Sequence, residues 1–150
     1  MPGGESGGIV ALPARGGVAL PPRSGPLTPR EADVIRQALA AAREETGLWF
    51  SAFIGPLGGD VRREARRLHA ALGERAEHAV LVVIEPEARA VEIVTGRTAR
   101  RRLDDQAAAL AAVSMATMLG GGDLVGALVQ GLRMLAEAAA RPPVPGQAQR

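Results

Sequence analysis

The sequence predicts an α/β protein, a three-layer α/β/α sandwich with a small mixed sheet and the element order αβαββαα. Three observations lead to this prediction. Short, nearly continuous apolar runs, typical of strands covered on both faces, occur at residues 48–54 and 79–84. Longer segments around them carry apolar residues every three or four positions, as amphipathic helices do. A strand, a helix and a second strand in succession form a right-handed unit with parallel strands.

The first helix is expected over residues 29–46. Thr28 can cap it and Glu31 completes a capping box, while a proline occupies the first helical position. Gly47 is expected to end this helix, because glycine readily adopts the left-handed conformation found there. The run LWFSAFI at residues 48–54 then contains every aromatic residue of the chain and is predicted to be the first strand.

A second helix, a second strand and a third strand are expected next. Asp60 can cap a helix that starts at the following residue and is closed by Gly73. The apolar run at residues 79–84 forms the second strand. Only a tight connection containing Pro86 separates it from a third strand at residues 90–95, so these two strands should be antiparallel.

The remaining chain is expected to be helical. One helix starts near Thr98 or Asp104 and continues through Leu119, and its second half is apolar almost all round, which predicts burial on every side. Three consecutive glycines interrupt the helical pattern. Asp123 can then cap a last helix with a regular apolar stripe that begins at Leu124.

The chain divides into three parts. Residues 1–27 are rich in glycine and proline and are expected to form a flexible arm; the alternative is a short extended piece added to a sheet edge. Residues 28–141 form the α/β domain, and residues 142–150 form a disordered tail. A chain of 150 residues is long enough for one domain with a single core.

Composition excludes several kinds of chemistry. The chain has no cysteine, so disulfides, thiol catalysis and zinc sites built on cysteine are excluded. The formal net charge is only +2, because 16 acidic residues nearly balance the 18 basic ones. All 18 of these basic residues are arginines. No segment has the pattern of a secretory signal, and the longest apolar run, residues 107–119, is shorter than the roughly 20 residues that cross a bilayer. We therefore expect a cytoplasmic protein.

The stretch TGRTARRRLDD, residues 95–105, is the main candidate for a ligand site. The predicted topology gathers, at one end of the sheet, Glu77, Asp104, Asp105, Arg97 and Arg100. Carboxylates together with water can hold Ca²⁺ or Mg²⁺, which are the candidate cofactors. The two arginines can bind phosphate through paired hydrogen bonds. The alternative is structural: the aspartates cap the long helix and pair with the arginines of residues 100–102.

A second basic cluster, Arg62, Arg63, Arg66 and Arg67, lies on the second helix, off its apolar stripe. It offers a surface for nucleic acid or anionic lipid. Interleaved glutamates weaken this field, and the aromatic residues lie in a core strand rather than where bases could stack on them. Nucleic acid is therefore not the expected partner. His69 on the same helix is expected at its surface and not as a metal ligand.

Several stretches together are similar to an actinobacterial family of unknown function within the TPM-domain group. They are ETGLWFSAFIG, AVLVVIEPEARAVEIVTG, RRRLDD and LAAVSMATMLGGGDLVGALVQGL, and the resemblance covers about residues 28–142. It implies an α/β/α fold. Some TPM-domain proteins are reported as phosphatases or divalent-cation binders, and others as accessory factors of membrane complexes. That group commonly places an acidic residue and a glycine before the second strand; here Glu77 and His78 are followed by Ala79, so the glycine is missing.

The predicted function is a non-enzymatic interaction or accessory module, because no complete catalytic set is visible. Its partner would be another protein or a second copy of the chain, packed on the alanine-rich last helices. The alternative is a divalent-metal-dependent, phosphatase-like hydrolase. In it Glu77, Asp104 and Asp105 would hold the ion, and Arg97 and Arg100 would neutralise phosphate charge. Whether the protein is an enzyme is left open at this stage.

Overall fold

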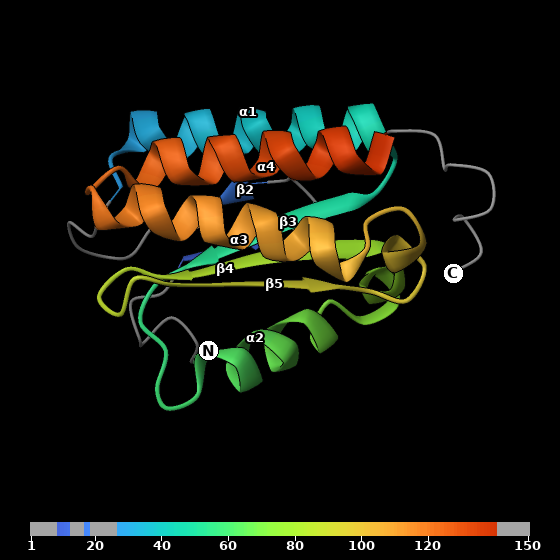
Figure 1. The fold of residues 1–150 in the computed structure, drawn as a ribbon, viewed down its shortest axis with the longest axis horizontal. Coiled ribbons are helices and arrows are strands. Elements are labelled where there is room, and N and C mark those ends of the chain that lie inside the picture. Colours follow the sequence, from blue (N-terminus) through green and yellow to red (C-terminus); the bar gives the residue numbers. More distant parts are fainter. Residues whose placement is uncertain (1–8, 13–16, 19–26, 141–150) are drawn as a thin grey trace.

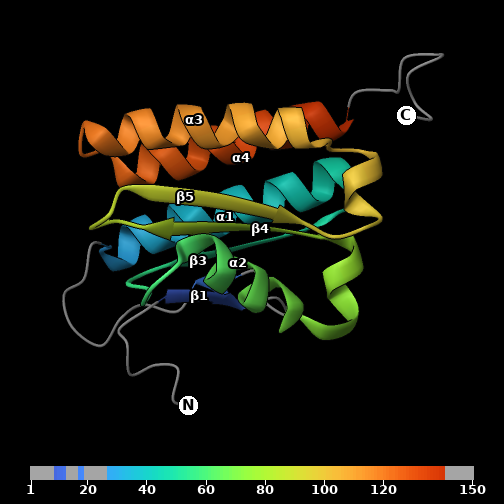
Figure 2. The same ribbon diagram turned by 60° about the horizontal axis from the view of Figure 1, so that its bottom comes forward.

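The computed structural model describes residues 9–12, 17–18 and 27–140. The elements in chain order are β1 (Ile9–Leu12), β2 (Gly17–Val18), α1 (Pro29–Thr46), β3 (Trp49–Ile54), α2 (Val61–Ala70), the 3-10 helix η3 (Gly73–His78), β4 (Ala79–Glu85), β5 (Ala90–Thr95), the 3-10 helix η4 (Ala99–Arg101), α3 (Asp105–Gly120) and α4 (Leu124–Ala140). Helices α1, α3 and α4 lie on one face of the sheet and α2 lies on the other (Figures 1 and 2). The predicted three-layer α/β sandwich and its element order are confirmed.

The sheet is mixed, and its strand order is β2-β1-β3-β4-β5. Strands β3 and β4 are parallel, with Trp49 opposite Ala79, as the predicted strand–helix–strand unit requires. Strands β4 and β5 are antiparallel, with Val80 opposite Thr95. Strand β5 therefore forms one edge of the sheet, and no strand of the described ranges pairs with its outer side.

The segment expected to be a flexible arm contributes to the opposite edge. β1 pairs antiparallel with β3, with Ile9 opposite Ile54, and β2 pairs with β1. Residues 9–12 and 17–18 agree with the alternative of an extended piece at a sheet edge. The other residues of 1–26, and the predicted tail at 142–150, lie outside the described residues.

The predicted caps at Thr28, Gly47 and Asp60 are present, but α2 ends at Ala70 and not at Gly73, which begins η3. The Thr28 hydroxyl accepts a hydrogen bond from the Glu31 amide at 3.1 Å, while the Thr28 amide donates to the Glu31 carboxylate at 2.8 Å. Gly47 ends α1 in the left-handed region, at φ 78°. Asp60 accepts from the Arg62 amide at 3.1 Å at the start of α2. The two N-caps satisfy backbone amides that have no partner within their own helix, and Gly47 donates its amide to the Arg43 carbonyl at the other end of α1.

Two predictions about burial were wrong. His69 is 9% exposed rather than on the surface, because α2 turns it onto β4, where its Nε2 lies 3.3 Å from the Ala79 carbonyl oxygen. Helix α3 is not buried all round: Leu110 and Val113 are 59% and 65% exposed. α3 packs through one face only, and nothing in the described part of the chain covers its other side. No helix in the described ranges is long and apolar enough to cross a membrane.

Candidate functional site

Gly96 has a structural reason to be a glycine. Its amide donates to the Ala79 carbonyl at 2.9 Å, and the Thr98 amide donates to the Glu77 carbonyl at 3.0 Å. These bonds bring the end of β5 against η3 so closely that a Cβ on Gly96 would overlap the carbonyl oxygens of Ala76 and Glu77. The glycine therefore permits a close backbone approach in this segment.

The arginines that follow Gly96 are directed outward by two buried neighbours. Ala99 and Leu103 are fully buried and anchor η4 to the core. Arg97 reaches Glu77, with its Nη2 3.7 Å from Oε2, but both side chains are exposed, so this pair contributes little to stability. Arg100 turns back onto β5 and donates from Nη2 to the Thr95 carbonyl at 3.0 Å.

Arg102 has a different role, because it joins two helices. Its Nε donates to the Ala139 carbonyl at 3.0 Å, and its Nη2 donates to the Thr46 carbonyl at 2.9 Å. These carbonyls lie at the C-terminal ends of α4 and α1, where a cation is favoured by the unsatisfied carbonyls and by the helix dipole. The predicted pairing of these arginines with the two aspartates is wrong, since no ion pair within the described ranges joins them.

The three carboxylates predicted to bind a metal have separate surroundings. Glu77 accepts a hydrogen bond from the Thr98 hydroxyl at 3.1 Å. Asp104 caps α3 by accepting from the Ala107 amide at 2.9 Å. Asp105 follows in the first turn of α3. Over residues 27–140, no three His, Asp or Glu side chains gather as a ligand set. Ca²⁺ or Mg²⁺ binding therefore stays a prediction.

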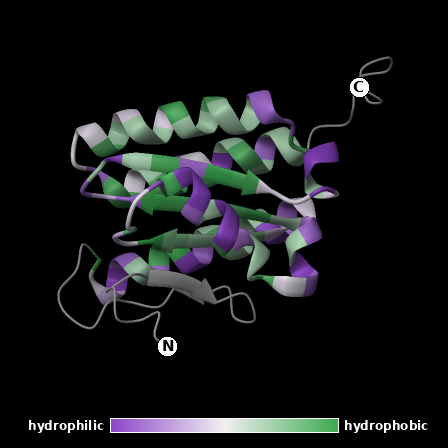
Figure 3. Cartoon of the chain, turned by 90° about the horizontal axis from the view of Figure 1, so that it is seen from below, coloured by the Kyte–Doolittle hydropathy of each residue, from purple (hydrophilic) through white to green (hydrophobic). Residues whose placement is uncertain are grey.

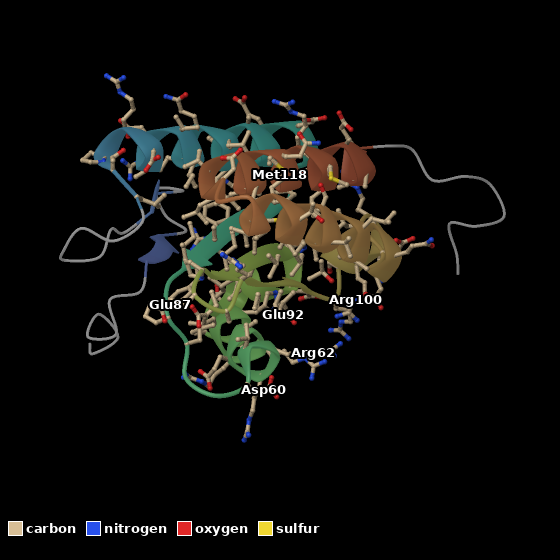
Figure 4. All side chains as sticks on the ribbon, turned by 60° about the vertical axis from the view of Figure 1, so that its left-hand side comes forward. Asp60, Arg62, Glu87, Glu92, Arg100 and Met118 are labelled. Carbon is tan, nitrogen blue, oxygen red and sulfur yellow. The ribbon has the colours of Figure 1, made fainter. Side chains whose placement is uncertain are left out.

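A groove of about 710 Å³ runs along the outer edge of β5. β5 lines it from Val91 to Thr95, between α2 and α3. The α2 side contributes Arg62 and Arg66, and the α3 side contributes small apolar residues together with Val113. Figure 4 shows Arg62 and two further residues of this groove, Glu92 and Arg100, on the same side of the molecule.

The groove collects only part of the predicted site. Arg100 and Asp105 line it, whereas Glu77, Arg97 and Asp104 do not. Sequence reasoning missed that β5 is an edge strand and that α2 brings its arginines to the same place. One signal was available: the segment AVEIVT has a glutamate in its middle, which is unusual for a strand covered on both sides.

The hydrogen-bond pattern shows which backbone groups of β5 face the groove. The Gly96 amide donates to the Ala79 carbonyl, and these two residues lie opposite each other when the register of β4 and β5 is continued by one residue. In an antiparallel pair every second residue forms backbone hydrogen bonds to the neighbouring strand, so Gly96, Val94 and Glu92 bond to β4. The amide and carbonyl groups of Val91, Ile93 and Thr95 therefore point toward the open edge. Arg100 occupies the Thr95 carbonyl. The backbone amides and carbonyls of Val91 and Ile93 stay available for hydrogen bonds to a further strand.

A second cluster surrounds Trp49 at the start of β3. Two guanidinium groups lie over its ring, with the Arg43 carbon 4.4 Å and the Arg75 carbon 4.6 Å from the ring centre. Burial lowers the pKa of Arg43, and the positive charge of Arg75 lowers it further. Two guanidinium groups already occupy the indole, so this ring is a poor platform for a nucleic-acid base.

These features define an α/β/α sandwich whose mixed sheet is extended by β1 at one edge and open at β5. Solved structures share the fold. The N-terminal domain of a protein from P. gingivalis matches with a TM-score of 0.67 and 18% identity, over 76% of this chain and 76% of that chain. The BA42 protein from the psychrophilic bacterium Bizionia argentinensis matches with a TM-score of 0.67 and 18% identity, over 76% and 81% of the two chains.

The N-terminal domain of the cg2496 protein from Corynebacterium glutamicum matches with a TM-score of 0.65 and 14% identity, over 77% of this chain and 76% of that chain. Identities this low establish the fold alone. The family model described as a domain of unknown function (DUF5130) matches residues 4–136, and the chain belongs to that family. The predicted family of unknown function is confirmed, while the TPM grouping and the actinobacterial origin remain predictions.

Proposed function

We propose that this domain is a non-enzymatic interaction module and that the groove along β5 is its binding surface. The observation that carries the proposal is an open sheet edge beside exposed apolar side chains. Unpaired strand edges bind other chains readily, and exposed apolar surface marks interaction sites. Val113 lines the groove and is 65% exposed, and Leu110 on the same helix is 59% exposed.

The proposal extends to the finer class predicted from the sequence. A TPM-like accessory factor that acts on the cytoplasmic side, through a protein partner, agrees with the resemblance of residues 28–142 and with a surface suited to protein contacts. The partner is a protein rather than a nucleic acid. One of the four arginines of α2, Arg67, is already paired with Glu64, and the Trp49 ring is occupied by Arg43 and Arg75.

A photo-crosslinking experiment tests the interaction module. A benzophenone amino acid is placed at Val113 and, as a matched control, at Val34, another exposed valine, on α1. In cells that express the protein, position 113 should yield a discrete cross-linked partner that excess unlabelled protein displaces. Position 34 should not yield it. If both positions capture the same set of proteins, the groove is not a specific binding surface and the proposal fails.

A metal-dependent phosphatase is the competing function, and thermal melts with Ca²⁺, Mg²⁺, Mn²⁺ and phosphate test it directly. A ligand at 100 times its dissociation constant adds about 2.7 kcal/mol to the free energy of unfolding. We expect no such shift. A shift that disappears in the double variant Glu77→Gln, Asp105→Asn would favour the phosphatase instead. Asp104 is left intact in this test because it caps α3.

A further inference from the structure

We infer that the groove takes an extended segment of a partner protein that alternates apolar and acidic residues and adds to β5 as a further strand. This inference rests on the proposed function and names the chemistry of the partner. Strand addition supplies affinity through main-chain hydrogen bonds, and the side chains that flank the edge supply specificity. Both contributions can be read from the residues around β5.

The backbone of β5 provides the register for an added strand. Val91 and Ile93 present their amide and carbonyl groups to the open edge, while Glu92 and Val94 bond to β4. Arg100 covers the Thr95 carbonyl and so limits pairing at that end. At about 3.3 Å per residue, the exposed part of β5 suits a segment of roughly five residues.

The two sides of the groove differ in chemistry, which predicts an alternating ligand. Successive side chains of a strand point to opposite faces. On the α3 side they would meet Ala108, Ala112 and Val113, which leave space for apolar groups. On the α2 side they would meet Arg62 and Arg66, together with Glu92 of β5 itself. An added strand would therefore place its apolar residues toward α3 and its alternate residues toward two guanidinium groups.

The charge of the groove selects acidic residues. Arg62, Arg66 and Arg100 line it, against Glu92 and Asp105. Over the described ranges no ion pair engages Arg62 or Arg66, whereas their neighbour Arg67, which does not line the groove, is paired with Glu64. The groove therefore keeps cations with no carboxylate partner of their own, and a ligand carboxylate can pair with them.

The same charges argue against a second copy of the chain as occupant. Two copies joined through β5 would be related by a two-fold axis perpendicular to the sheet, which keeps both α2 helices on the same face. Arg62 and Arg66 of one copy would then approach their equivalents in the other, and Glu92 would approach Glu92. Like charges placed opposite each other across strands are unfavourable. A different chain with acidic residues avoids the repulsion between the arginines, because its carboxylates pair with them; only the residue opposite Glu92 meets a like charge.

A defined peptide tests the inference. The probe is an acetylated, amidated and fluorescently labelled TEVEVET, whose binding to the whole chain is followed by anisotropy. Binding should be saturable. TKVKVKT, and TEVEVET methylated on alternate backbone nitrogens, should bind at least about tenfold more weakly, because they lack the carboxylates or the edge donors. In amide hydrogen exchange, the peptide should slow Val91 and Ile93 and leave the already bonded Glu92 and Val94 unchanged.

Two arginine variants locate the charge effect. Arg62→Ser with Arg66→Ser should weaken TEVEVET by about tenfold. The matched control, Arg63→Ser with Arg67→Ser, removes the same charge from the same helix outside the groove and should change binding by less than about twofold. Equal losses in both double variants would show a general charge effect and would overturn the inference.

Three further results would each overturn it. The first is equal binding of TKVKVKT and TEVEVET, and the second is unchanged amide hydrogen exchange at Val91 and Ile93 when TEVEVET is added. The third is amide exchange at Val91 and Ile93 that slows with rising protein concentration in the absence of peptide, which would identify a second copy as the occupant. If TEVEVET fails to bind while Val113 still cross-links a discrete partner, the acidic-strand inference fails and the interaction module stands. If both experiments fail, neither proposal survives.

Discussion

The two faces of the sheet are built very differently. On the face covered by α1, α3 and α4, the core is a large cluster that includes Phe50, Leu103 and Leu132. On the face covered by α2, the buried cluster formed by the described residues is smaller and consists of Phe53, Ala65, Leu81 and Val83. The comparison shows that most of the apolar burial lies on one side of the sheet. The other side is a thin layer that carries charge.

The composition of α2 explains the difference. Ala65 and His69 are its buried residues, and its remaining surface is rich in arginine. Viewed from below, hydrophobic strands lie behind a helix with much hydrophilic surface (Figure 3). Such a helix can bury only a narrow stripe. The charged layer on one side and the apolar α3 on the other are what give the groove along β5 two unlike sides.

Matched leucine truncations should show the largest contrast between the two faces. Leu132, on α4, is 1% exposed and Leu81, on β4, is 4% exposed. Leu132→Ala should reduce the free energy of unfolding by about 3–5 kcal/mol, because α1 and α3, which pack against α4, cannot close the cavity. Leu81→Ala should cost about 2–3 kcal/mol, because α2 can settle onto the smaller residue. Urea unfolding measures both. Equal losses would contradict the difference in packing.

Replacing a glycine by alanine should lower the free energy of unfolding by a smaller amount, which depends on whether the new methyl group meets backbone or a side chain. Gly96→Ala should cost about 1–3 kcal/mol, because the new methyl meets the backbone of Ala76 and Glu77 and η3 must move. Gly131→Ala is the control, since its methyl meets a side chain, that of the buried Met115, which shifts more readily than backbone does, and alanine favours the helix. Denaturant midpoints compare the two. A greater loss for Gly131→Ala would sink this explanation.

Arg102 should show the smallest of the three effects on stability. Arg102→Ala removes two hydrogen bonds to the carbonyls of Ala139 and Thr46 and should cost about 1–2 kcal/mol. Arg101→Ala, an exposed arginine one position earlier, should change stability by less than about 0.5 kcal/mol. The difference between the two thermal unfolding curves is the test. Identical curves would mean that Arg102 does not join α1 to α4.

The candidate site was only partly predictable from the sequence. The stretch from Thr95 to Asp105 did contain residues that line a groove, Arg100 and Asp105. It also contained Arg102, which binds helix ends, and Asp104, which caps α3. These roles cannot be told apart locally, because each arginine has the same chemistry and only the position of a distant carbonyl decides which one is used.

The sequence by itself determined most elements of residues 28–140: the caps that begin the helices, the course of β3, β4 and β5, and the antiparallel arrangement of β4 and β5. Such features depend on residues within a few positions of one another. The tertiary structure decided that α3 leaves Leu110 and Val113 exposed, that β1 extends the sheet, and that Arg62 lies beside the same groove as Arg100. These outcomes depend on how separate elements pack, because only packing determines which edge and which face remain uncovered.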